Sequence, residues 1–174
     1  MFWRNSCRHS NSSDLRPAPF RGTSAEVAAL FEEILREDSL LRVKATGRSM
    51  RPFLRGGEVL IIRKTVVSSL RRGDLILFKN RQGVPVIHRI VRKMRGNDGA
   101  IAFETKGDAQ LSLDEPVGGS EILGKVCRIE GARSLDMEAG VWRGVNYMLA
   151  IVHLMRSVLY FAFGSSRALL RLRS

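Results

Sequence analysis

The sequence predicts a mainly β fold: a coiled or barrel-like β domain with an amphipathic helix before it and a helical segment after it. Six short stretches of the 174 residues have the composition and the period-two alternation of strands. They are residues 41–46, 58–63, 74–79, 84–92, 101–105 and 122–129. Glycine-containing turns separate them, and short strands at this spacing favour a coiled or closed sheet over βαβ units. We therefore expect one β-rich domain over residues 39–131.

The segment before this domain carries a helix start signal. Thr23 and Glu26 have the spacing of a capping box, and the apolar residues that follow recur at intervals of three and four. This pattern predicts an amphipathic helix over residues 24–37, and we assign residues 24–38 to this helical segment. Residues 1–23 lack the apolar stretch of a secretory signal, and their mixture of Ser, Asn, Arg and Pro predicts a disordered head.

The last part of the chain predicts a basic amphipathic helical tail over residues 141–174. On a helical wheel one arc gathers polar side chains, and most apolar side chains take the opposite side. The polar arc holds Arg143, Asn146, His153, Arg156 and Ser157. The tail is long enough to span a bilayer, but Arg156 within it would cost about 2.5–3.5 kcal/mol on insertion. We therefore expect the helix to lie in a membrane interface, with packing on the β core or on a partner as the alternative.

Basic residues are concentrated at the two ends of the chain. The formal net charge is +12; residues 1–22 hold four Arg against one acid, and residues 141–174 hold five Arg and no acid. Basic tails disfavour a nucleic-acid-binding face on the core and favour contact of the tails with an anionic surface. Cys7 and Cys127 have neither metal-ligand nor disulfide spacing. We expect no nucleic-acid partner, no metal and no cofactor, and a cytoplasmic or peripheral membrane location without an N-terminal signal or a clear transmembrane anchor.

A serine lies in the turn-forming stretch TGRSMRP, residues 46–52. A serine hydroxyl is a poor nucleophile at neutral pH unless a base lies within hydrogen-bond reach and the local geometry exposes it. Gly47 permits a close backbone approach, and Pro52 prevents the stretch from continuing as a regular strand or helix. The N–H of Ser49 would then be an oxyanion donor. Taken alone, such a serine more often belongs to a structural turn.

A histidine and two aspartates complete a candidate catalytic group with Ser49. His88 lies in VPVIHRIV, a run that is apolar on both strand faces, where a lone histidine is more often a core residue than a base. Asp108 follows a glycine at the end of a strand and is expected to accept the second ring N–H of His88. Asp114 is either a second acid or a turn residue. The candidate catalytic residues are therefore Ser49, His88, Asp108 and Asp114.

Short motifs follow one another between residues 47 and 126: GRSMRP, GGEVL, RGDLILF, VIHRI, TKGDA and LGKV. In this order they resemble signal peptidase I, in the superfamily of serine proteases that also includes the LexA-type repressors. Most bacterial members have lysine where this chain has His88. The archaeal and endoplasmic-reticulum type has histidine followed by the aspartates that Asp108 and Asp114 match. The resemblance therefore implies a histidine-type serine endopeptidase that acts on a peptide or precursor protein.

Two features depart from that family. Members that process exported proteins usually carry a membrane anchor just before the serine motif, where this chain has the polar helical segment 24–38. Lysine-type enzymes can carry a hydroxyl two residues before the nucleophile, where this chain has Gly47. We expect removal of a signal or leader peptide from a precursor, with Ser49 as nucleophile, His88 as base and Asp108 orienting it. A self-cleaving LexA-like protein and a catalytically silent binding module are the alternatives.

Overall fold

The computed structural model describes residues 23–37, 39–96, 99–132 and 134–170, and for residues 161–170 it describes the backbone only. The head that was predicted to be disordered therefore lies outside the described residues, except for Thr23. The elements, in chain order, are α1 (Ser24–Arg36), β1 (Leu41–Lys44), β2 (Val59–Arg63), η1 (Val67–Ser69), β3 (Leu75–Lys79), β4 (Pro85–Arg95), β5 (Ile101–Lys106), β6 (Val117–Gly118), η2 (Gly119–Glu121), β7 (Ile122–Glu130), β8 (Leu135–Asp136) and α2 (Gly140–Leu170).

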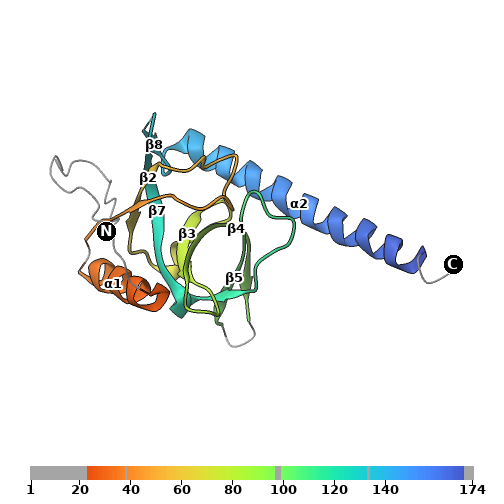
Figure 1. Cartoon of the computed structure of the whole chain (residues 1–174), viewed down its shortest axis with the longest axis horizontal. Helices are drawn as coiled ribbons and strands as arrows, with labels where there is room; N and C mark the ends of the chain where they lie inside the picture. The colour runs from red at the N-terminus through yellow and green to blue at the C-terminus, as the bar shows by residue number, and fades with distance from the viewer. Residues whose placement is uncertain (1–22, 38, 97–98, 133, 171–174) are drawn as a thin grey trace.

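The predicted fold class is confirmed: eight strands form one antiparallel sheet, with α1 before it and α2 after it. The strand order is β1-β2-β7-β3-β4-β5-β6, and β8 pairs with β7. The sheet curls strongly, so that its strands wrap around a core (Figure 1). The register shifts in the pairings of β2 with β7, β3 with β7 and β4 with β5, where local bulges add to the curvature.

Strand β3 divides the hydrophobic core into two clusters. Leu75 and Leu77 pack into one cluster, whereas Ile76 and Phe78 pack into the other, and all four side chains are buried. This follows from the strand geometry, because successive side chains point to opposite faces of a sheet. A strand that is apolar at four successive positions therefore lies between the two clusters.

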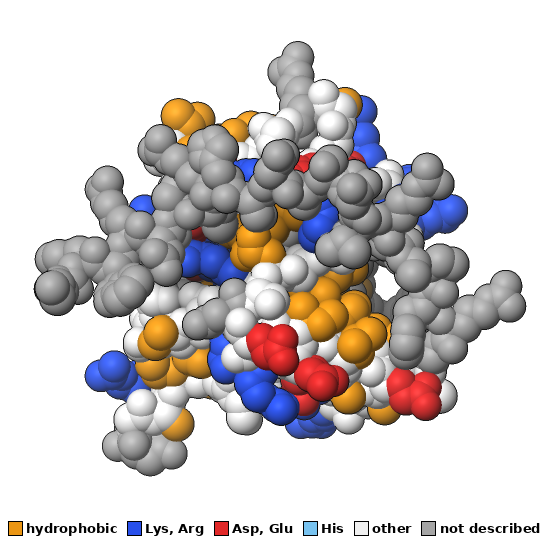
Figure 2. Space-filling view, turned by 90° about the vertical axis from the view of Figure 1, so that its left-hand side faces the viewer, with side chains coloured by type: hydrophobic (Ala, Val, Ile, Leu, Met, Phe, Trp, Pro, Cys, Tyr) orange, Lys and Arg blue, Asp and Glu red, His pale blue; other side chains and the backbone are white. Residues whose placement is uncertain are grey.

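Helix α1 begins and packs as its sequence predicts. Thr23 Oγ1 accepts a hydrogen bond from the Glu26 backbone, and the Thr23 N–H donates to Glu26 Oε2 at 2.7 Å, which completes the capping box. Leu35 is buried in the first core cluster, with Phe31 and Ile34 packed against it. On the face nearest α1, acidic, basic and hydrophobic side chains lie side by side (Figure 2).

Helix α2 turns its polar arc toward the β domain. Asn146, Ala150, His153 and Ser157 are all buried, although three of the four are polar. The sequence favoured a helix in a membrane interface and left packing on the β core as the alternative; the structure packs this arc on the β core, where strand β4 and the end of β5 offer charged partners. Among the residues that the structure describes, no helix is both long and apolar enough to cross a membrane.

Candidate active site

Ser49 lies in a tight turn between β1 and β2, anchored by the residue that follows it. The Met50 side chain is buried in the first core cluster, and the Met50 carbonyl accepts a hydrogen bond of 2.9 Å from the Leu54 N–H. The Ser49 carbonyl accepts a hydrogen bond of 2.7 Å from the N–H of Ala109. These contacts fix the serine backbone while its side chain stays half-buried at the surface.

The close backbone approach at this turn belongs to Gly107 and not to Gly47. A Cβ on Gly107 would lie 2.8 Å from the Ser49 carbonyl oxygen and 3.0 Å from the Ser49 Cβ, whereas a Cβ on Gly47 would meet nothing within 4 Å. The prediction that Gly47 permits the close approach is therefore wrong. The loop after β5 packs directly against the turn that contains Ser49, and a side chain at position 107 would clash with that turn.

His88 is positioned by a carboxylate on one side of its ring. Nδ1 of His88 lies 2.6 Å from Oδ2 of Asp114, and Thr105 Oγ1 donates to the same oxygen at 2.8 Å. The Asp114 N–H donates to the Thr105 carbonyl at 2.9 Å, which ties the loop to β5. The other ring nitrogen, Nε2, is buried and has no hydrogen-bond partner among the described residues. A carboxylate beside Nδ1 favours the tautomer in which Nδ1 carries the ring proton. Nε2 then has a free lone pair and can act as a base.

Asp108 does not contact His88, and this corrects the prediction that it orients the base. Its two carboxylate oxygens bind Arg89, at 2.9 Å to Nε and 2.8 Å to Nη2, and Oδ1 lies 3.3 Å from Nε2 of His153. The alternation along β4 explains the difference, because neighbouring residues on a strand point to opposite faces. Asp114 therefore meets His88 on one face, and Asp108 meets Arg89 on the other.

Arg89 belongs to a buried polar cluster that joins the β domain to α2. Its Nη1 donates to Asn146 Oδ1 at 2.5 Å and to the Gly73 carbonyl at 3.2 Å, and its guanidinium lies 4.7 Å from the centre of the Phe53 ring. An arginine buried this deeply is stable only when its donors are paired, and here helix and strand pair them together.

Lys106 extends the same cluster along α2. Its ammonium donates to Ser157 Oγ at 2.7 Å and to the His153 carbonyl at 3.1 Å. Burial lowers the pKa of Lys106, and the positive charge of Arg156 lowers it further, while Asp108 opposes the shift. Burial likewise lowers the pKa of His153, again against the opposing effect of Asp108. These groups were not predicted as a unit, because only the fold brings α2 to the end of β5.

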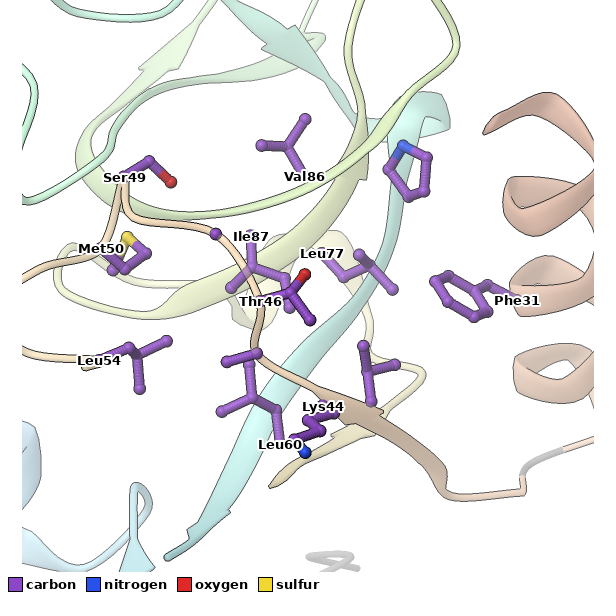
Figure 3. A pocket seen from close by; sticks show the side chains of 14 residues that line it. Phe31, Lys44, Thr46, Ser49, Met50, Leu54, Leu60, Leu77, Val86 and Ile87 are labelled. Atoms are coloured by element: carbon purple, nitrogen blue, oxygen red, sulfur yellow. The ribbon is translucent and has the colours of Figure 1, made fainter. Parts of the chain in front are cut away.

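Two hollows meet at Ser49. The first, of about 230 Å³, is mainly apolar; Ser49 lies at one end of it and Phe31 of α1 at the other (Figure 3). The second, of about 480 Å³, is lined by Ser49, His88 and Asp114 among others. The structure therefore brings three of the four candidate residues to one surface hollow. Asp108 lines neither hollow.

No family model matches the chain. Over 61 residues it is 31% identical to the signal peptidase complex catalytic subunit SEC11C of Homo sapiens, and equally to SEC11C of Mus musculus and of Canis lupus familiaris. Each match covers 34% of this chain and 32% of the relative, so the chain spans about a third of the length of the curated relatives it matches. The chain is thus similar in part to the catalytic subunit of a signal peptidase.

Proposed function

We propose that this protein is a serine endopeptidase that removes a signal or leader peptide from a precursor. The observation that carries the proposal is the shared hollow of Ser49, His88 and Asp114, in which Asp114 holds one ring nitrogen of His88 and leaves the other without a partner. The partial similarity to SEC11C supports the same class of reaction.

The proposed reaction is acyl transfer. Ser49 Oγ attacks the carbonyl carbon of the scissile peptide bond while His88 Nε2 takes the hydroxyl proton. The C–N bond then breaks, and His88 returns that proton to the leaving amine. Water attacks the resulting ester with His88 again as base, which releases the acid product and restores Ser49. Asp114 stabilises the imidazolium that forms in both steps.

The backbone of Ser49 fits the role of an oxyanion donor. The N–H of Ser49 makes no hydrogen bond to any residue that the structure describes. A backbone N–H fixed beside the nucleophile stabilises the negative charge that develops on the carbonyl oxygen. The carbonyl of the same residue is held by Ala109, so the peptide plane on that side of Ser49 is fixed before substrate binds.

The apolar hollow beside Ser49 suits a small apolar side chain of the substrate. Val86 and Ile87 line it on the side of the serine, and Leu60 and Leu77 lie farther from Ser49 (Figure 3). A cavity of about 230 Å³ with a mainly apolar lining gains from burying an apolar side chain. We therefore propose that the residue before the scissile bond is small and apolar.

Incubation of the full chain with a mixture of signal- and leader-type peptides tests this function by mass spectrometry. Cleavage after a small apolar residue is expected for the wild type and for Ser68→Ala, which changes an exposed serine far from the site in sequence. Cleavage is expected to vanish in Ser49→Ala. Fragments that arise from the protein's own chain in place of the peptides would favour a self-cleaving protein.

A further inference from the structure

The outward side of α2 carries a continuous apolar stripe. Five of its side chains are more than half exposed: Val141 at 77%, Met148 at 58%, Val152 at 53%, Met155 at 60% and Leu159 at 52%. On a helical wheel they fall within an arc of about 60°, nearly opposite the buried arc of the same helix. We call these five residues the outward stripe. A contiguous exposed apolar patch of this kind marks an interaction site.

The buried side of α2 prevents the helix from rotating to hide this stripe. Arg89 and Lys106 are fully buried and donate hydrogen bonds to Asn146 and Ser157 on the helix, so a rotation would leave two cations without these partners. The backbone at Gly73 also packs tightly against the helix, because a Cβ at this position would lie 2.7 Å from the Asn146 backbone. The outward stripe is therefore a permanent feature of the folded chain.

The charge of this part of the chain indicates what covers the stripe. Residues 141–174 contain five Arg and no Asp or Glu; on the described helix Arg156 is exposed and flanks the stripe, whereas Arg143 lies on the arc nearly opposite to it. If two copies packed stripe to stripe, their arginines would gather with no acidic residue on either helix to neutralise them. An anionic surface neutralises them instead, and the apolar stripe enters the acyl boundary.

The shape of the site agrees with a flat partner. The C-terminal part of α2 projects beyond the β domain (Figure 1). Trp142 lies near the start of the helix, where an aromatic ring fits the headgroup level. We propose that the outward stripe of α2 docks the protein on an anionic lipid surface. This docking does not depend on catalysis by Ser49.

Vesicle flotation of the full chain tests the docking surface. Wild type is expected to float with phosphatidylcholine vesicles that contain phosphatidylglycerol, and to float less with phosphatidylcholine alone or at high salt. The double variant Met148→Glu/Met155→Glu is expected to bind at least about tenfold less. It replaces two apolar side chains that would enter the lipid with negative charges that the anionic headgroups repel. Arg156→Gln, which removes the arginine that flanks the stripe, is expected to keep binding to neutral vesicles and to weaken the preference for anionic ones.

A matched double variant controls for the added charge. Leu40→Glu/Val66→Glu changes two exposed apolar residues outside α2 and is expected to float like the wild type, as is Ser49→Ala. Circular dichroism and thermal unfolding show whether each variant folds. The proposal is overturned if the wild type stays at the bottom with anionic vesicles, or if Met148→Glu/Met155→Glu floats like the wild type. It is also overturned if light scattering shows a lipid-free dimer that this variant dissociates, because a second copy then covers the stripe.

Discussion

Nδ1 of His88 lies 2.6 Å from Oδ2 of Asp114, while the carboxylate six residues earlier, Asp108, binds Arg89 on the opposite face of β4. Two aspartates that look alike in the sequence therefore have separate tasks. Asp114 holds the proposed base, and Asp108 neutralises a buried cation that joins strand and helix. This division gives each aspartate its own measurable signature.

Asp114→Asn is expected to lower kcat by about 10²-fold to 10⁴-fold, because an amide at this position no longer favours the basic tautomer of His88 or stabilises its imidazolium. The free energy of unfolding should change little by comparison, since Asp114 lies at the surface hollow. Steady-state cleavage kinetics and urea unfolding measure the two effects. A variant with full kcat would show that Asp114 is only a loop residue.

Asp108→Asn is expected to act mainly on stability. It leaves the Arg89 guanidinium buried without a counter-charge, and removal of one partner of a buried ion pair costs about 3–5 kcal/mol. Glu115→Gln is the matched control, because Glu115 and Arg81 form an exposed pair whose loss costs little. Urea unfolding measures both variants. If Asp108→Asn instead kept its stability and lost kcat as severely as Asp114→Asn, the separation of roles would be wrong.

Gly107→Ala is expected to impair both folding and cleavage, because the new Cβ would press on the Ser49 carbonyl from 2.8 Å. Overpacking of this kind costs about 1–3 kcal/mol and would shift the nucleophile. Gly47→Ala has open space and is expected to leave activity within about twofold of wild type, since surface changes of this kind alter stability by only a few tenths of a kcal/mol. Comparing kcat for the two variants shows which glycine the site requires; a larger loss in Gly47→Ala would reverse the assignment.

His153 predicts a pH dependence of stability. Burial lowers its pKa below the 6.5 of an unperturbed histidine, with Arg89, Lys106 and Arg156 acting in the same direction and Asp108 against it. Below about pH 6.5 the unfolded chain therefore binds a proton that the folded chain does not, so stability falls as pH falls through this range. His153→Gln should lose less stability than the wild type between about pH 7 and pH 5. The prediction is contradicted if the free energy of unfolding, measured with urea, falls by the same amount in both proteins across this pH range.

Local patterns were sufficient to predict most of the fold. The capping box and apolar spacing located α1, and alternation with glycine turns located six strands. The two further strands, β6 and β8, have two residues each, too few to show a period. The polar arc of α2 was found in the sequence, but its burial depends on Arg89 and Lys106, which only the folded sheet places beneath it.

The candidate site was predictable only in part. Taken alone, Ser49 is typical of a turn and His88 of a core, and it was the ordered series of motifs around them that indicated a nucleophile and a base; the structure places both at one hollow. The choice between Asp108 and Asp114 depends on the path of the loop after β5 relative to the faces of β4. Strand alternation predicts that His88 and Arg89 point to opposite faces of β4. No local pattern predicts which of the two aspartates in the following loop lies near His88 and which lies near Arg89.

Labelling of the full chain with a fluorophosphonate probe, read by peptide mass spectrometry, tests the central claim most directly. The account predicts a single modified residue, Ser49, with labelling strongly slowed in His88→Ala and Asp114→Asn and unchanged in Ser68→Ala. Absence of labelling in the folded wild type, or labelling of Ser49 at the same rate in His88→Ala, would contradict it.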